Sequence, residues 1–293
     1  MRFYGLIHGV DLNNKLISIK RFHKLYFFYF QNSLMHLFKR YLYQGIFIDF
    51  SYDENKLAFK SYCEAYLITD VYEVSRKNRL ANAMFYNKNT INKSLKEILN
   101  SLNNILFLDL EMTMPEYHQS GHYSSEIIQA GFYLTDSDFK KIAANTYYIS
   151  PKKSKKLSQR TIDFLKISQD KFSNECIKYK EFYNIFKNIL EKYKPTIIVY
   201  GKNDMIALDN SYNLNSLPSL KEECRFINLN SILKQFYSLR SDPGLFKLYE
   251  YFYNTDETQI HNALDDAYVT YLVFKAFLEN INNGKKLPKE LFS

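Results

Sequence analysis

The chain has 293 residues, of which 46% are hydrophobic and 24% are charged, and this composition excludes a disordered or fibrous protein. Its length allows one large domain or two domains of ordinary size. The formal net charge is +8, and residues 1–100 hold most of it, with 15 Lys and Arg against 8 Asp and Glu. Such a basic region is typical of proteins that contact a polyanion, although a lysine-rich solvated surface explains the charge equally well.

The cysteines and the apolar segments indicate the compartment. Cys63, Cys176 and Cys224 are far apart and odd in number, which argues against a disulfide framework or a structural zinc site. The first nine residues lack the apolar core of a signal peptide, and no apolar run approaches the roughly 18 residues that a membrane span needs. We therefore expect a cytoplasmic protein with reduced thiols and no membrane partner.

Residues 1–75 are predicted to form a small, basic, β-rich domain. Residues 32–42 have apolar side chains at helical spacing, which predicts a helix between the third and fourth of five expected strands. This order of elements resembles that of an OB-type barrel, a fold that binds single-stranded nucleic acid. The strands are expected at residues 3–10, 16–21, 25–31, 45–50 and 65–74.

The third expected strand carries a run of aromatic residues directly after several basic ones. Because side chains alternate between the two faces of a strand, one face must fill the barrel and only the other is available for stacking on bases. For any single aromatic residue, packing in the core remains the simpler explanation. The two faces are Leu25, Phe27 and Tyr29, and Tyr26, Phe28 and Phe30.

A second domain is predicted over residues 103–282, after a connector at 76–102 and before a tail at 283–293. It begins with Ile105–Leu108, four apolar residues that indicate a buried strand. Asp109 and Glu111 follow and emerge on the same side of this strand, roughly 6 to 7 Å apart. Two such carboxylates repel each other unless a cation lies between them, so a divalent metal is the obvious partner. Surface strands also carry Asp-x-Glu pairs by chance.

Further strands and helices are expected after this one. Residues 126–134 and 145–149 read as strands, so that the domain opens with three neighbouring, antiparallel strands. Helices are expected at 158–164 and 178–193. His118 and His122 lie in a polar segment with Pro and Gly, and we interpret them as loop residues instead of metal ligands.

Two more acidic residues follow predicted elements further along the chain. Residues 195–199 form an apolar strand that ends in Gly201-Lys202-Asn203-Asp204, and ligands of open α/β sheets gather at this end of the strands. Asp266 begins an apolar helix, and His261 precedes it. Four carboxylates on three elements with one histidine suit two divalent ions that clamp the attacking and leaving oxygens of a phosphodiester.

In this order, the three segments resemble the motifs of the DEDD 3′–5′ exonucleases, in the histidine-bearing (DEDDh, DnaQ-like) branch. The motifs are residues 107–113, 200–204 and 261–267, and the resemblance covers about residues 103–280. The Gly-x-x-Asp form of the second motif is similar to that of the RNA-directed, enhanced-RNAi-type members, whereas proofreading members carry a His-Asn-x-x-Phe-Asp form. The family spacing selects Asp266, and the adjacent Asp265 is a bystander.

The resemblance implies a ribonuclease-H-like α/β fold, in which a mixed sheet is flanked by helices. It also implies that two Mg²⁺ or Mn²⁺ ions are bound and that His261 takes the proton from the attacking water, releasing nucleoside 5′-monophosphates. Met112 and Thr113 would flank the sugar and base of the terminal nucleotide. The implied metal ligands are Asp109, Glu111, Asp204 and Asp266.

Three functions remain open at this point. The first is a 3′–5′ exonuclease that acts on single-stranded nucleic acid, with RNA favoured over DNA. The second is a DNA exonuclease for trimming or proofreading. The third is a nucleic-acid-binding protein that no longer cuts, which the intact motifs disfavour.

Overall fold

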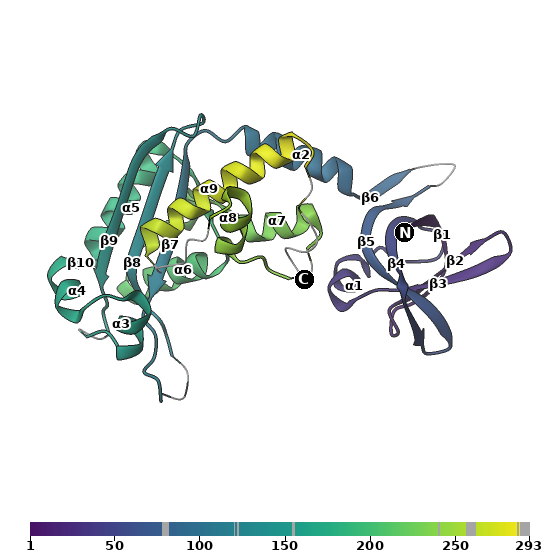
Figure 1. The fold of residues 1–293 in the computed structure, drawn as a ribbon, viewed down its shortest axis with the longest axis horizontal. Helices are drawn as coiled ribbons and strands as arrows, with labels where there is room; N and C mark the ends of the chain where they lie inside the picture. Colours follow the sequence, from purple (N-terminus) through teal and green to yellow (C-terminus); the bar gives the residue numbers. More distant parts are fainter. Residues whose placement is uncertain are drawn as a thin grey trace. The chain divides into compact units, whose positions relative to one another are not determined.

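The computed structural model divides into two compact units, Met1–Leu95 and Lys96–Ser293, each described here by itself (Figure 1). The residues that the structure describes are 1–77, 82–119, 121, 123–153, 156–239, 241–255, 262–285 and 287.

The first unit is a small barrel-like β structure. Its strands pair in the order β3-β2-β1-β4-β5-β6, and β3 also pairs in parallel with β5 through Phe28↔Tyr66 and Tyr29↔Leu67, so that the first five strands form a closed circuit. The helix lies between the third and fourth strands, as the sequence predicts. The elements are β1 (Arg2–Asp11), β2 (Leu16–Arg21), β3 (Lys24–Tyr29), α1 (Asn32–Phe38), β4 (Phe47–Lys60), β5 (Cys63–Arg76) and β6 (Ala83–Asn87).

The core of this barrel confirms the predicted alternation along the third strand. Phe28 and Phe30 are fully buried, and Tyr26 packs against the same core cluster. Leu25 is exposed and Tyr29 is only half-buried, so these side chains belong to the outer face. The inner aromatic face is therefore used for folding, and only the outer face is left for contacts with other molecules.

Two strands of the barrel extend beyond their predicted ranges. β4 and β5 have 14 residues each and form a hairpin that turns at Ser61 and Tyr62, and the exposed residues 54–56 form a bulge in β4 between Asp53 and Leu57. A bulge interrupts the alternation of side chains from which strands are predicted. Residues 83–87, within the expected connector, form β6 and pair with β5, and helix α2 (Lys88–Asn100) follows directly.

The second unit is a six-stranded mixed sheet flanked by helices, as expected for a ribonuclease-H-like fold. The strand order is β10-β9-β8-β7-β11-β12; β7, β8 and β9 are antiparallel neighbours, and β11 runs parallel to β7. The strands are β7 (Ile105–Met112), β8 (Ile127–Thr135), β9 (Lys141–Ser150), β10 (Ile177–Lys178), β11 (Thr196–Val199) and β12 (Arg225–Asn228). The helices are α3 (Gln159–Leu165), α4 (Gln169–Glu175), α5 (Tyr179–Tyr193), α6 (Asn203–Asn215), α7 (Leu229–Tyr237), α8 (Leu245–Tyr253) and α9 (Ala263–Asn282).

The two faces of this sheet are covered by different helices (Figure 1). Leu108 and Leu110 of β7 belong to the core cluster that also contains residues of α5 and α6. Phe107 points the other way, and its ring centroid lies 5.4 Å from that of Tyr271 and 5.7 Å from that of Phe274, both on α9. Side chains at 109 and 111 share the face of Phe107, and therefore face α9.

Among the described residues, none of the helices is both long and apolar enough to cross a membrane.

Candidate active site

Three carboxylates from two elements converge beside the end of β7. Asp109 and Glu111 come from the strand, and Asp266 comes from the first turn of α9. One carboxylate oxygen of each lies within 4.8 Å of the others. Glu111 and Asp266 are buried, whereas the neighbouring Asp265 is exposed, so that the helix presents to the cluster the aspartate that the motif spacing selected.

The start of α9 is fixed by a cap and by contacts with β8. The Asn262 side chain accepts a hydrogen bond from the Leu264 N–H at 3.0 Å, as expected of an N-cap residue. Gln129 of β8 is buried, and its Oε1 accepts a longer bond from the Ala263 N–H at 3.5 Å. Its Nε2 donates to the Thr146 hydroxyl at 3.2 Å, which orients the amide. The helix therefore begins at a defined position on the sheet.

Gly131 allows the backbone of α9 to approach the sheet closely. It pairs with Asp109 across β7 and β8, and a Cβ atom at this position would lie 2.1 Å from the carbonyl carbon and oxygen of Ala263. No side chain fits there without moving the helix. Neither Gly131 nor Gln129 was predicted from the sequence, although a glycine inside an apolar strand pattern is a signal for such an approach.

Asp204 joins the same end of the sheet from the other side of β7. β11 runs parallel to β7 and ends before Gly201, whose φ of 149° is a conformation that side chains rarely adopt. The turn leads into the first turn of α6, where the buried Asp204 accepts a hydrogen bond from the Leu110 N–H at 3.1 Å. This bond holds the fourth carboxylate next to the Asp-x-Glu segment.

Burial and mutual repulsion make these carboxylates unusually weak acids. Burial first, and then the charges of Asp204, Asp266 and Glu111, raise the pKa of Asp109 well above its ordinary value. Burial, and then the charges of Asp266 and Asp204, raise the pKa of Glu111 to about 7. Burial raises the pKa of Asp204 to about 6, although the bond from Leu110 opposes the shift. The anionic cluster is therefore costly in the absence of a cation.

The donor set fits a divalent metal ion. Carboxylate oxygens are the ligands that hard cations such as Mg²⁺ and Mn²⁺ prefer. The 4.8 Å spread of the three oxygens lets one ion contact all of them after small side-chain movements, and Asp204 lies beside them. A bound cation would also offset the repulsion that raises these pKa values.

The remaining predicted site residues lie in or near the segments that flank the cluster. His261 lies outside the described residues; in the sequence it precedes the cap residue of α9 directly. Met112 is half-buried at the end of β7. Thr113 is buried, and its hydroxyl accepts a hydrogen bond from the Glu126 N–H at 2.9 Å. The Thr113 N–H donates to the Glu126 carbonyl, also at 2.9 Å, so the backbone after β7 is held in place.

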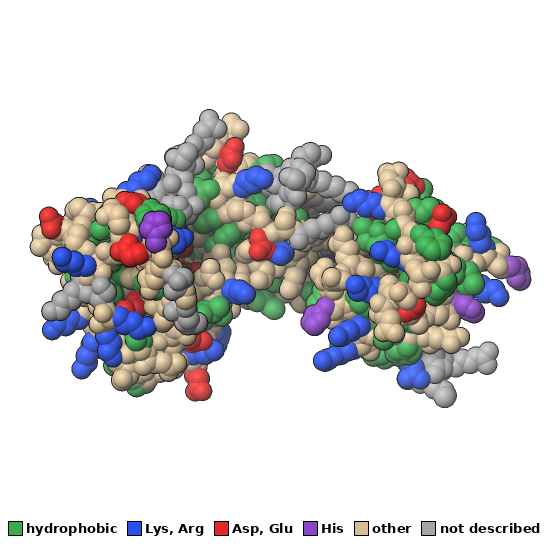
Figure 2. All heavy atoms as spheres, turned by 90° about the horizontal axis from the view of Figure 1, so that it is seen from below, with side chains coloured by type: hydrophobic (Ala, Val, Ile, Leu, Met, Phe, Trp, Pro, Cys, Tyr) green, Lys and Arg blue, Asp and Glu red, His purple; other side chains and the backbone are tan. Residues whose placement is uncertain are grey.

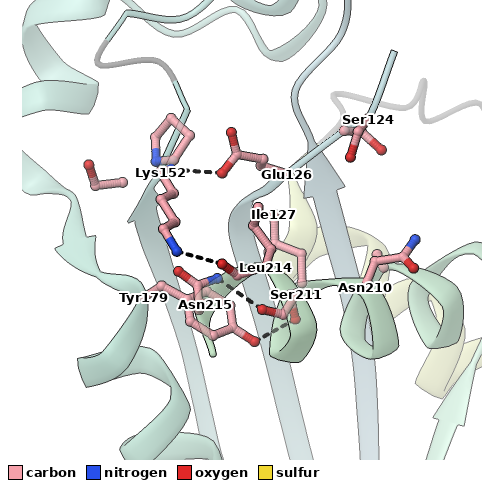
Figure 3. A pocket seen from close by; sticks show the side chains of 13 residues that line it. Ser124, Glu126, Ile127, Lys152, Tyr179, Asn210, Ser211, Leu214 and Asn215 are labelled. Carbon is pink, nitrogen blue, oxygen red and sulfur yellow. Dashed lines mark hydrogen bonds between the residues drawn. The ribbon is translucent and has the colours of Figure 1, made fainter. Parts of the chain in front are cut away.

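A small cavity lies on the opposite side of the sheet, between α6 and the adjoining ends of β8 and β9 (Figure 3). Its volume is about 30 Å³, which is room for about two water molecules. Lys152 crosses it, donating from Nζ to the Leu214 carbonyl at 2.6 Å, while its backbone N–H donates to Glu126 at 2.7 Å. The cavity is too small for a nucleotide.

Comparisons with known proteins agree with this geometry. The model of the family described as Exonuclease (RNase T) matches residues 106–274, a segment that includes all four carboxylates. The probable 3′-5′ exonuclease KapD of Bacillus subtilis (strain 168) is 33% identical over 175 residues, which are 59% of this chain and 83% of that protein. The chain belongs to the DEDDh-type 3′–5′ exonuclease family. It is therefore a nuclease, and members of this family use divalent metal ions.

Solved structures show the same fold at low sequence identity. A 3′-exonuclease that recognises the histone mRNA stem-loop has a TM-score of 0.54 and 18% identity, covering 68% of this chain and 72% of that one. The nuclease domain of 3′hExo, a DEDDh family member bound to rAMP, has a TM-score of 0.53 and 20% identity, covering 64% and 96%. Cell-death related nuclease 4 (CRN-4) has a TM-score of 0.52 and 20% identity, covering 63% and 66%.

We predict that the metal-free protein loses stability as the pH rises through about 7, and that Glu111 contributes to this loss. The pKa of Glu111 is about 7 in the folded protein and about 4.3 in an unfolded chain. Because the pKa of this carboxyl is higher in the folded protein than in the unfolded chain, its protonation stabilises the folded state. This stabilisation is complete below the pKa of the unfolded chain, and it is lost as the pH rises through the pKa of the folded protein. Thermal unfolding in EDTA between pH 4.5 and 8 should show a smaller decrease in Tm for Glu111→Gln.

The control for this experiment is Glu116→Gln, which changes an exposed carboxylate in the loop after β7. It should keep the pH dependence of the unchanged protein. Added Mn²⁺ should raise the Tm of the unchanged protein more at pH 8 than at pH 5, since protons and cations compete for the same oxygens. An identical pH dependence in Glu111→Gln would contradict the assignment.

A second prediction concerns the contact between β8 and α9. Gly131→Ala should lower the free energy of unfolding by about 1–3 kcal/mol, because the new methyl group overlaps the Ala263 backbone. It should also weaken Mn²⁺ binding, measured by calorimetry, since the first turn of α9 carries Asp266. Gly244→Ala is the matched control: its Cβ would meet only the Lys247 Cβ, at an ordinary 3.9 Å. Unchanged Mn²⁺ affinity in Gly131→Ala would show that the close approach does not position Asp266.

Proposed function

We propose that this protein is a metal-dependent 3′–5′ exonuclease that removes nucleoside 5′-monophosphates from single-stranded nucleic acid, and that RNA is its preferred substrate. The observation that carries the proposal is the convergence of Asp109, Glu111 and Asp266 within 4.8 Å in a chain of the DEDDh-type family. Isolated acidic pairs are common on protein surfaces, but buried carboxylates from separate elements are not.

In this proposal, the four carboxylates hold two divalent ions, Mg²⁺ or Mn²⁺. The ions, when bound, supply positive charge for the attacking and leaving oxygens of the phosphodiester. Asp204 is held towards the cluster by the Leu110 N–H, and Asp266 by the docked first turn of α9. The chain thus contributes ligands whose positions are fixed by packing before substrate arrives.

His261 is proposed as the general base. Its imidazole nitrogen accepts a proton from the attacking water, and an ordinary histidine pKa near neutrality suits this step. The oxygen of this water then bonds to phosphorus while the bond between phosphorus and the 3′ oxygen of the preceding nucleotide breaks, and this 3′ oxygen takes a proton from solvent to become a hydroxyl. The products are a nucleoside 5′-monophosphate and a strand that is one residue shorter.

Met112 and Thr113 are proposed to contact the terminal nucleotide. Met112 lies at the end of β7, one residue after Glu111, where an apolar side chain can pack against a base. The Thr113 hydroxyl accepts a bond from the Glu126 N–H and retains its own hydrogen as a donor to a sugar oxygen.

The preference for RNA is supported by the second motif. Gly201-Lys202-Asn203-Asp204 has the Gly-x-x-Asp form of the RNA-directed, enhanced-RNAi-type members, to which we assign this chain. One of the similar structures concerns recognition of a histone mRNA stem-loop, and another contains bound rAMP. We assign binding of the single-stranded nucleic acid to residues 1–75 and the nuclease activity to residues 103–282.

The deciding experiment compares RNA and DNA of one sequence, labelled at the 5′ end, in Mg²⁺, Mn²⁺ and EDTA. The proposal predicts a ladder that shortens from the 3′ end, faster on RNA and absent in EDTA. Equal or faster shortening of DNA would favour a DNA-directed trimming or proofreading enzyme. Binding without shortening of either strand would favour a protein that no longer cuts.

Asp109→Asn should abolish nucleotide release while binding of labelled RNA in EDTA stays unchanged. The substitution keeps the shape of the side chain but removes the charge that a cation needs, and it also removes repulsion from the cluster. The control is Asp265→Asn, which changes the exposed aspartate next to Asp266 and should retain activity. Undiminished release by Asp109→Asn would remove the metal-site proposal.

His261→Ala should slow hydrolysis by roughly 10²–10⁴, the usual loss when a general base is removed. Mn²⁺ affinity, measured by calorimetry, should be unchanged because the carboxylates remain. The pH–rate profile of the variant should also lose the limb that reports the base. His118→Ala, which removes a histidine of the loop after β7, serves as the control. A matching loss in both variants would exclude His261 as the base.

A further inference from the structure

We propose that the β-rich unit contains a nucleotide-binding groove where β3 meets β5, formed around Lys15, Tyr29 and Lys60. The inference rests on the proposed function, because it names the residues through which the first unit holds the single strand. It concerns the first unit alone and uses no feature of the nuclease unit.

The groove is large enough for a nucleotide. Its volume is about 520 Å³, within the roughly 300–1,000 Å³ typical of small-ligand sites. Three segments form its walls: the turn between β1 and β2, the end of β3 with the residues that follow, and Lys60 at the end of β4. The Phe30 N–H donates to the Lys15 carbonyl at 2.9 Å, which ties the first two walls together.

The charges of the groove suit a phosphate. Two lysines, Lys15 and Lys60, line it, and none of the described residues that line it is acidic. Within the described part of the chain, neither lysine forms an ion pair with a carboxylate. Asp11, the nearest acid before the turn, accepts hydrogen bonds from the backbone and side-chain N–H groups of Asn14 at 3.0 and 2.8 Å. It holds the turn and is not part of the lining.

Tyr29 supplies an aromatic surface in the same place. It lies on the outer face of β3, half-buried, and its pairing with Leu67 fixes its backbone where the barrel closes. The Lys60 ammonium lies 4.8 Å from the centre of its ring. A stacking surface beside a cation is the combination with which proteins hold single strands without reading their sequence.

Further aromatic residues continue outward from the groove on the hairpin of β4 and β5. Phe59 is 72% exposed and Tyr62 is 61% exposed, on either side of Lys60 along the chain. The centroid of the Tyr62 ring lies 6.1 Å from that of Phe27, which is on the same outer face of β3 as Tyr29. On the face of this unit that Figure 2 shows, Lys and Arg side chains are more frequent than Asp and Glu. A strand that leaves the groove therefore meets further stacking surface.

The first test removes the two lysines in the full chain. Lys15→Gln with Lys60→Gln should weaken binding of a labelled 15-nucleotide single strand in EDTA. The slope of log affinity against log salt should also fall by about 0.7 for each phosphate that is no longer neutralised, thus by about 1.4. The control pair is Lys39→Gln with Arg40→Gln, which removes equal charge from exposed residues after the other end of α1. An equal weakening in both pairs would overturn the groove.

The second test separates stacking from charge. Tyr29→Leu should weaken the same binding by about fivefold to 100-fold, as expected when one stacked base is left without its aromatic partner, whereas Tyr29→Phe should bind as the unchanged protein does. Circular dichroism and thermal unfolding identify any variant whose barrel is damaged. Unchanged affinity of a folded Tyr29→Leu would overturn the assignment of Tyr29.

A third measurement separates failure of the groove from failure of the proposed nuclease. A dinucleotide has no further nucleotide to place in the groove while its single phosphodiester lies in the nuclease site. The lysine pair variant should therefore hydrolyse it at the unchanged rate while its KM for the 15-nucleotide strand rises. A reduced dinucleotide rate would mean that the lysines act at the nuclease site, which overturns the groove. If the unchanged protein hydrolyses neither substrate, the nuclease proposal fails, and the binding measurements in EDTA still decide the groove.

Discussion

The contact between the first turn of α9 and strand β8 is the constraint on which the carboxylate cluster depends. Asp266 reaches Asp109 and Glu111 only because Gly131 leaves room for the Ala263 backbone. The cluster itself opposes this arrangement, since burial and like charges raise the pKa values of its members. Packing between α9 and β7 on the same face, rather than attraction within the site, holds the acids together. Stability is thus traded for a preformed cluster of carboxylates.

Local sequence patterns predict the fold of the second unit, and they also predict the carboxylate residues of the cluster. Alternation along β7 places Asp109 and Glu111 on one face, and motif spacing distinguishes Asp266 from the exposed Asp265. The support for these residues could not be predicted in this way. Gln129 and Gly131 contact residues more than 130 positions away in the sequence. Neither hydrophobic periodicity nor secondary-structure propensity predicts such a contact. The positions that arrange the acids became visible only in three dimensions.

The barrel shows the same division between local and distant information. The order of its strands along the chain, and the grouping of Phe28 and Phe30 on one face, follow from turn signals and alternation, but which face is buried does not. The length of the β4–β5 hairpin could not be predicted, because the bulge at residues 54–56 interrupts the alternation along β4. The closure of β3 on β5, through two residue pairs, is likewise a contact between distant segments. The groove around Tyr29 lies at this closure and is thus invisible in the sequence alone.

The position of α9 has a consequence for the order in which the protein is made. Asp109 and Glu111 are synthesised early in the nuclease unit, whereas Asp266 follows more than 150 residues after Asp109. The opening strands of the sheet can pair while the chain is still growing, but Asp266, the last of the four acids, arrives only with the last long helix. A ribosome-bound chain from which α9 has not yet emerged therefore lacks one of the four carboxylates. The proposed nuclease site is therefore completed only when this helix folds against the sheet.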